Sequence, residues 1–346
     1  MNFHTGFDNF VGIITAAQQK TLSRKTNTLH WIDRYLNRNR EELFPAPRPE
    51  PAVRTGHTRS IAGFDYQTLF FESDHLPLVE ETLGDYRRHH GPLHTFKARK
   101  VSRRGFSPRR AIVHVHGWME PGSILEDVLV GPLMCRGLDA DLYHFQLPHH
   151  GERQIRESRY DGAMFVTADL MLTFEAIRQS VMDTRTVIQH VLNLGIYDEV
   201  GVTGISLGAM VTKLTACTES RISWAVPIIG HLDLTDVIDK APILDEVRKE
   251  MASFGISTQK LGELIELVGF TRVMPVIPHE RIIVVAARDD VFVRADSMRR
   301  QLDRWPGVQE VWIPGGHLTS LIRLPGLLPD LRRRLDRLPA RAAGKL

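Results

Sequence analysis

The chain of 346 residues is long enough for one large α/β domain with insertions or for two ordinary domains. Hydrophobic residues make up 42% of it and charged residues 25%, which indicates a folded globular chain rather than a disordered one. Because 44 Lys and Arg face 41 Asp and Glu, the net charge of +3 does not suggest nucleic-acid binding.

Cysteine use and the N-terminus indicate where the protein works. Cys135 and Cys217 are too few for a disulfide framework or a four-cysteine metal site, which fits a reducing compartment. The apolar stretch near the N-terminus lacks a basic region before it. No window holds the roughly 18 to 20 uncharged apolar residues that span a bilayer. We therefore expect a cytoplasmic protein with no transmembrane segment.

Residues 1–55 are predicted to form a helical extension that ends in a linker. Between Asn9 and Phe44, apolar residues recur at spacings near 3.6, which predicts one or two amphipathic helices. The proline-rich run PAPRPEP, residues 45–51, breaks this pattern and is typical of an extended linker. The α/β core is therefore expected to begin at residue 56.

From residue 56 onward, short apolar strands alternate with helical segments. Tyr66 to Glu72 and His94 to Lys100 are predicted to pair as strands, and five more strand-like runs follow: AIVHVHG, DLYHFQLP, DEVGVTG, WAVPIIG and RIIVVAA. The stretch from Thr167 to Leu194 carries apolar residues along one face and predicts a long crossover helix. This alternation predicts a mostly parallel sheet with helices on both faces.

Residues 231–280 interrupt the alternation of strands and helices. Their helical patterns predict a cap inserted between two parts of the core, residues 56–230 and residues 281–346. Five apolar residues of the cap favour an apolar substrate group, or simply pack the cap: Leu261, Leu264, Ile265, Val268 and Phe270.

The sharpest motif is Gly-Ile-Ser-Leu-Gly at residues 204–208, between the strand-like DEVGVT and a helical run. A tight turn from strand to helix strains the backbone of its central residue, and only glycine avoids clashes at the flanking positions. Such a turn lifts the hydroxyl of Ser206 clear of the sheet. Ser206 is therefore the candidate nucleophile.

A serine hydroxyl needs a base within hydrogen-bond reach and an acid that orients the base. His317 follows a strand-like run and two glycines, and Asp289 and Asp290 follow RIIVVAA, at the carboxyl end of a strand where α/β sheets bind ligands. The chain order Ser, Asp, His is the one expected in an α/β sheet. We assign Asp289 as the acid, because an apolar pair, Val291 and Phe292, follows it after one residue. Asp290 stays the alternative.

Acyl transfer also needs N–H donors aimed at the developing oxyanion. One candidate is the backbone N–H of Leu207, directly after the nucleophile, and the other is that of Trp118, in the loop after AIVHV. His116, Gly117 and Met119 surround Trp118 in the chain and are assigned to substrate binding. The indole of Trp118 is also placed to wall the acyl pocket.

Four histidines raise a metal alternative, because His114, His116, His149 and His150 lie near the predicted carboxyl ends of neighbouring strands. A zinc site needs three or four convergent ligands, and the sequence has no helical His-Glu-x-x-His pair and no cysteine cluster. We therefore assign no metal, and interpret His116 as a residue that shapes the oxyanion loop.

Together these motifs resemble the α/β-hydrolase superfamily over residues 60–335. Within it, LPHHGERQIRESRYDG, followed by the long helix and by VTGISLGAM, looks like the group named for α/β-hydrolase domain containing protein eighteen. The resemblance implies the α/β-hydrolase fold, a triad of Ser206, Asp289 and His317, and no cofactor. For the narrower group it leaves the natural substrate open.

The leading hypothesis is hydrolysis of a small-molecule carboxylic ester or thioester through an acyl-enzyme on Ser206. A catalytically silent fold that holds a ligand is the alternative, but it predicts a lost triad member, and none is evidently lost. A third hypothesis is contact with a membrane surface through the basic end, Arg332 to Arg341. The sequence does not decide the acyl chain, the leaving group or the oligomeric state.

Overall fold

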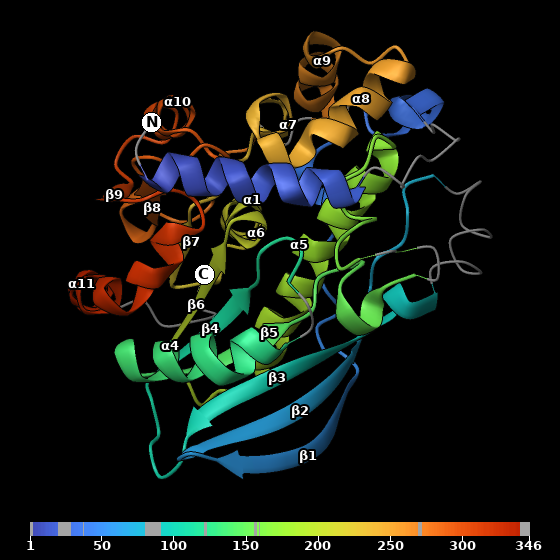
Figure 1. Ribbon diagram of the computed structural model, residues 1–346. Coiled ribbons are helices and arrows are strands. Elements are labelled where there is room, and N and C mark those ends of the chain that lie inside the picture. Colours follow the sequence, from blue (N-terminus) through green and yellow to red (C-terminus); the bar gives the residue numbers. More distant parts are fainter. Residues whose placement is uncertain are drawn as a thin grey trace.

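The computed structural model describes residues 3–19, 29–36, 38–79, 91–120, 123–155, 158, 160–268 and 272–339. Its strands form one sheet in the order β1-β2-β3-β5-β4-β6-β7-β8-β9 (Figure 1). The strands are β1 Val53–Ile61, β2 Phe64–Glu72, β3 Thr95–Arg103, β4 Arg110–Val115, β5 Ala140–Phe145, β6 Glu199–Ile205, β7 Trp224–Ile228, β8 Ile283–Ala287 and β9 Gln309–Ile313. The pairs from β1 to β5 are antiparallel, and those from β5 to β9 are parallel.

Helices cover both faces of this sheet. They are α1 Phe3–Gln19, α2 Arg40–Leu43, α4 Gly131–Gly137, α5 Leu170–Asn193, α6 Leu207–Ala216, α7 Leu234–Lys240, α8 Asp245–Ser253, α9 Thr258–Val268, α10 Ala295–Asp303 and α11 Leu324–Asp336. On β4, Val113 joins a core with α5, α6 and α10, whereas Ile112 joins a second core with α4 and α11. Adjacent strand residues point to opposite faces, so a strand with apolar residues on both faces contributes to both cores. The prediction of a mostly parallel sheet with helices on both faces is confirmed.

The N-terminal edge of the sheet differs from the prediction. The segments predicted at Tyr66 to Glu72 and His94 to Lys100 do pair, as antiparallel β2 and β3. A further strand, β1, lies outside them and begins at Val53, so the predicted start of the core at residue 56 falls inside a strand. Most β1 side chains are exposed, and a strand at an edge needs no apolar alternation.

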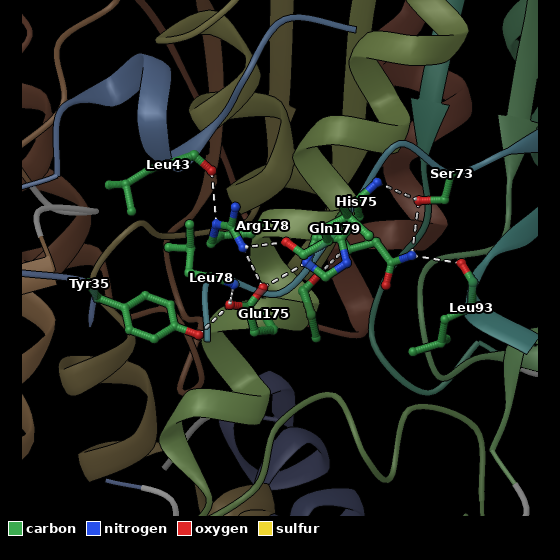
Figure 2. Close-up of polar contacts among 12 residues, drawn as sticks. Tyr35, Leu43, Ser73, His75, Leu78, Leu93, Glu175, Arg178 and Gln179 are labelled. Carbon is green, nitrogen blue, oxygen red and sulfur yellow. Dashed lines mark hydrogen bonds and ion pairs between the residues drawn. The ribbon is translucent and has the colours of Figure 1, made fainter. Parts of the chain in front are cut away.

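The segments before β1 and after β2 are anchored to the long helix α5 by a buried polar network (Figure 2). Glu175 of α5 accepts hydrogen bonds from the hydroxyl of Tyr35 and from the backbone N–H of Leu78, and it pairs with His75 and Arg178. Burial alone would raise the pKa of Glu175, but the Arg178 guanidinium and these hydrogen bonds lower it to about 2. A buried carboxylate with this many partners is fully satisfied.

The region between β7 and β8 consists of helices α7, α8 and α9 with the short 3₁₀ helix η6, Pro242–Leu244. Leu261, Leu264 and Ile265 are buried in the core shared with α5 and α6. The side chain of Val268 and the whole of Phe270 lie outside the described residues. Helix α1 packs against η6 and α8, so the N-terminal helix reaches this region, hereafter the cap (Figure 1). Among the helices described, none is long and apolar enough to cross a membrane.

Candidate active site

Ser206 stands at the sharp turn between β6 and α6. Its backbone has φ 55° and ψ −112°, a strained conformation for a residue with a side chain, and its N–H donates to Ile228 O at 2.9 Å. A side chain at position 204 would overlap Gly208 O, and one at position 208 would overlap Val115 O. Both glycines of the motif are therefore required by the close approach of β6, α6 and β4.

The imidazole of His317 lies between Ser206 and Asp290. His317 Nε2 is 2.8 Å from Ser206 Oγ, and His317 Nδ1 is 2.7 Å from Asp290 Oδ2. Both His317 and Asp290 are buried. Burial alone would lower the pKa of His317, but the Asp290 carboxylate raises it above its ordinary value. This geometry makes His317 an acceptor for the Ser206 proton and Asp290 the group that fixes the imidazole tautomer.

The assignment of Asp289 as the acid beside His317 is wrong. Asp289 stays in register with the segment after β9: its N–H donates to Gly315 O at 3.0 Å, and its Oδ2 accepts from Gly315 N–H at 3.3 Å. Asp290 begins the next turn, where its Oδ1 accepts the N–H groups of Phe292 and Val293 at 2.8 Å each. This turn leaves Oδ2 of Asp290 facing His317. The apolar pair Val291 and Phe292 therefore follows Asp290, the neighbour of His317, directly. We had expected one residue between the acid and this pair.

The two predicted oxyanion donors flank Ser206. Leu207 is the first residue of α6, so its N–H is one of those that have no acceptor within their own helix. On the other side, a side-chain carbon at Gly117 would stand 3.7 Å from Ser206 Cβ, which puts the turn that contains Trp118 next to the nucleophile. The indole N–H of Trp118 donates to Gly162 O at 2.8 Å and fixes its ring.

Two buried histidines, His116 and His150, hold the turn that contains Trp118 through hydrogen bonds to its backbone. His116 Nε2 accepts from Leu147 N–H at 2.9 Å, so its Nδ1 carries the proton and donates to Gly117 O at 2.7 Å. His150 Nε2 accepts from Met119 N–H at 3.2 Å. Burial lowers the pKa of His116 to about 4 and that of His150 well below its ordinary value, so both rings are neutral acceptors at pH 7.

Two of the three residues predicted to bind substrate do not line the cavity at Ser206. Of the three, only Gly117 lines it, as does the neighbouring Trp118, whereas His116 bonds to the backbone of Gly117 and Leu147, and Met119 N–H bonds to His150. His114 is fully buried in β4, and burial lowers its pKa to about 3. Among the described residues, no group of three or more His, Cys, Asp or Glu side chains is arranged to hold a metal ion.

A cavity of about 260 Å³ opens at Ser206 and His317. Its walls are mainly apolar and come from the turn after β4, the helices η4 (Glu126–Val130) and α6, the cap, the turn after β8 and the 3₁₀ helix η8 (Thr319–Arg323): Trp118, Leu125, Val130, Met210, Leu234, Val237, Ile243, Leu244, Phe292 and Leu321. Glu120 and Glu126 are the acidic members of the wall. Glu126 is only 3% exposed, and its Oε2 has no hydrogen-bond partner among the described residues. Burial raises the pKa of Glu126 to about 8, with Glu120 adding to the effect, so Glu126 is protonated at neutral pH.

We expect the Glu126→Gln substitution to stabilise the protein at pH 8 and to change little at pH 5. The folded-state pKa of Glu126 is raised, so the unfolded chain releases this proton from about pH 4.5 upward, whereas the folded chain keeps it until about pH 8. Wild-type stability therefore falls as pH rises through this window, by on the order of a few kcal/mol, and the glutamine removes that loss. Thermal unfolding at several pH values measures the difference.

Glu263→Gln, at an exposed position on α9, is the matched control and should leave the pH dependence of the unfolding temperature unchanged. The interpretation of Glu126 fails if the Gln variant and the wild type lose stability equally between pH 5 and pH 8.

A residue that sequence reasoning missed is Asp8 of α1. Its carboxylate accepts the backbone N–H of His317 and, at 3.1 Å, that of Leu318. No local motif marks Asp8, and 309 residues separate it from His317. Its only signal in the sequence is that it is the one carboxylate of a helical stretch without Lys or Arg.

The sheet order, the strained turn at Ser206 and the Ser-His-Asp arrangement at the carboxyl ends of the strands define the α/β-hydrolase fold. The family model "Alpha/beta hydrolase domain containing 18" matches residues 243–330, so the predicted resemblance to this group is confirmed, although in a different part of the chain from the motif that suggested it.

Two curated proteins of Mycobacterium tuberculosis, MT2702 of strain CDC 1551 / Oshkosh and Rv2627c of strain ATCC 25618 / H37Rv, are similar to this chain and are described as uncharacterized. Each is 23% identical over 171 residues, which cover 49% of this chain and 40% of the relative. The match with this chain thus spans about two fifths of the length of these relatives.

Solved structures of low sequence identity share the fold. Acetyl xylan esterase 1 from Thermoanaerobacterium sp. JW/SL YS485 has a TM-score of 0.54 at 13% identity, and the match covers 90% of this chain and 98% of that one. An acetyl xylan esterase from Paenibacillus sp. R4 has a TM-score of 0.56 at 11% identity, with the same coverage of 90% and 98%. At these identities the likeness supports the fold.

Proposed function

We propose that this protein is a serine hydrolase that cleaves a carboxylic ester or thioester through an acyl-enzyme on Ser206. His317 takes the hydroxyl proton as Ser206 attacks the acyl carbon, and then gives it to the leaving alcohol or thiol. Water, activated by the same imidazole, then releases the acid and restores Ser206. Asp290 holds the His317 tautomer and stabilises the imidazolium that forms at each attack.

The observation that carries this proposal is the unbroken line of hydrogen bonds from Ser206 through His317 to Asp290, at 2.8 and 2.7 Å. It opens on the cavity rather than into the core. The backbone N–H groups of Leu207 and Trp118 are proposed as the oxyanion donors. An intact triad beside a cavity argues against the alternative of a catalytically silent, ligand-holding fold.

The substrate is proposed to be a small-molecule ester with an apolar acyl group. The cavity walls are mainly aliphatic and aromatic, and protonation of Glu126 at neutral pH avoids a full charge there. A cytoplasmic location stays part of the proposal and rests on the two free, buried cysteines. Membrane-surface contact through the basic end is a separate hypothesis, and residues 340–341 of that segment lie outside the described residues.

A fluorophosphonate probe tests the proposed nucleophile without any knowledge of the substrate. We expect stoichiometric labelling of the native protein and, after digestion, a modified peptide that contains Ser206. Labelling should disappear in the heat-denatured protein, because the reactivity of the hydroxyl depends on His317 and on the oxyanion donors. Modification of another serine, or none, would contradict the proposal.

A further inference from the structure

Helix α1 lies across two parts of the molecule that both reach the active site. On one side it packs closely on the cap and on the turn after β8: a methyl group at Gly12 would stand 3.1 Å from Pro242 Cβ of the cap and 3.3 Å from a ring carbon of Phe292 after β8. On the other side it contacts the segment of residues 315–319, hereafter the histidine loop, which carries His317. Figure 1 shows α1 running between the cap helices and the C-terminal elements.

The contact with the histidine loop is a specific polar clamp. Asp8 is fully buried, and each of its carboxylate oxygens accepts one backbone N–H, Oδ2 from His317 and Oδ1 from Leu318. One turn earlier on α1, His4 Nδ1 lies 3.0 Å from the hydroxyl of Thr319. A side chain at Gly316 would overlap Asp8 Oδ2, so the loop is shaped to admit this carboxylate.

The clamp also places a second negative charge beside the imidazole. The groups that face His317 are Ser206 from the turn after β6, Asp290 from the turn after β8 and Asp8 from α1. The Asp8 and Asp290 charges both raise the pKa of His317, against the effect of burial. Burial and the nearby Asp290 charge raise the pKa of Asp8, against its two backbone hydrogen bonds, so the clamp is held at an electrostatic cost.

We propose that Asp8 is a positioning residue for His317, and that α1 is a strap that holds the histidine loop against the cap. The inference rests on the proposed function, in which His317 must lie within reach of Ser206. Asp8 touches the backbone of the histidine and not the reacting atoms. It therefore acts through His317, by fixing the angle at which the imidazole meets Ser206 and by favouring the imidazolium that forms during attack.

The Asp8→Asn substitution tests this role. An amide can accept only one of the two N–H groups, because its NH₂ faces the other, and it carries no charge. We expect kcat for a p-nitrophenyl ester to fall about 10- to 100-fold, since small misplacements of a catalytic group cost this much. The acidic limb of the pH profile should also move to lower pH, because His317 loses a neighbour that raised its pKa. Asp33→Asn, at an exposed position of the N-terminal extension, should match the wild type.

A measurement that needs no turnover separates this inference from the proposed function. NMR titration of the His317 ring, assigned by comparison with His317→Gln, should give a lower pKa in Asp8→Asn than in the wild type. If Asp8→Asn does not fold, Gly316→Ala serves instead, because its methyl group displaces the Asp8 carboxylate without removing its charge. This variant should also lower kcat and the pKa of His317. An unchanged His317 pKa and an unmoved acidic limb would overturn the inference, even if kcat fell. Failure of the wild type to react with fluorophosphonate would instead overturn the proposed function.

Discussion

Ser206→Ala is expected to abolish the turnover of short p-nitrophenyl esters while the protein stays folded. Removing the nucleophile of a serine triad lowers kcat by on the order of 10⁶-fold, because the base and the acid have no second acceptor for the acyl group. The backbone strain at position 206 arises from the Cβ, which Ser and Ala share. The free energy of unfolding should therefore change little. Steady-state kinetics with p-nitrophenyl acetate and butyrate measures the loss.

The matched control is Ser253→Ala on α8, where the serine is exposed and its hydroxyl donates to Glu250 O of the same helix at 2.6 Å. That variant should keep wild-type turnover, and both variants should give wild-type circular dichroism. Turnover by folded Ser206→Ala at the wild-type rate would remove Ser206 from the mechanism.

Asp290→Asn is expected to lower kcat on the order of 10⁴-fold, whereas Asp289→Asn should cost little. An amide at position 290 can present its NH₂ to His317 Nδ1 and so favour the tautomer that protonates Nε2, which then cannot accept the Ser206 proton. Asp289 faces Gly315, whose N–H donates to Asp289 Oδ2 at 3.3 Å, and it is Asp290 Oδ2 that meets His317 Nδ1. The same ester assay, run on two proteins that differ by one position, measures the contrast.

The comparison of adjacent residues contains its own control, because both variants lose one carboxylate from the same turn. Equal and large losses would mean that the turn after β8 is damaged as a whole. A large loss in Asp289→Asn alone would contradict the hydrogen bonding described for Asp290.

Much of the sheet could be predicted from the sequence because its inner strands are buried on both faces. β4, β5, β7 and β8 are almost entirely buried and mainly apolar, and such runs between helical patterns have few other interpretations. β1 escaped prediction for the opposite reason: as an exposed edge strand it is polar along most of its length. The Pro-rich run predicted a boundary between an N-terminal extension and the core. No such boundary exists, because Tyr35 and Phe44, which precede the run, are fully buried in the main core.

The site was predictable only where a residue type is tied to a local turn. Ser206 lies in a motif whose glycines are fixed by close packing, and His317 follows a glycine pair that its loop requires. The choice between Asp289 and Asp290 depends on where the sheet hydrogen bonding after β8 ends, and neighbouring residues do not encode that point. Asp8 depends on a tertiary contact alone.

The contact between α1 and the histidine loop also constrains the order of events during synthesis. Asp8 leaves the ribosome 309 residues before the backbone that it binds, an interval of roughly 15 to 60 s at ordinary elongation rates. For most of this time the cap and the histidine loop, on which α1 docks, have not been made, and Phe7 and Phe10 of α1 stay 42% and 63% exposed even in the finished fold. Helix α1 is thus made long before the surfaces on which it docks. Its final position is fixed only when the backbone N–H groups of His317 and Leu318 become available to Asp8.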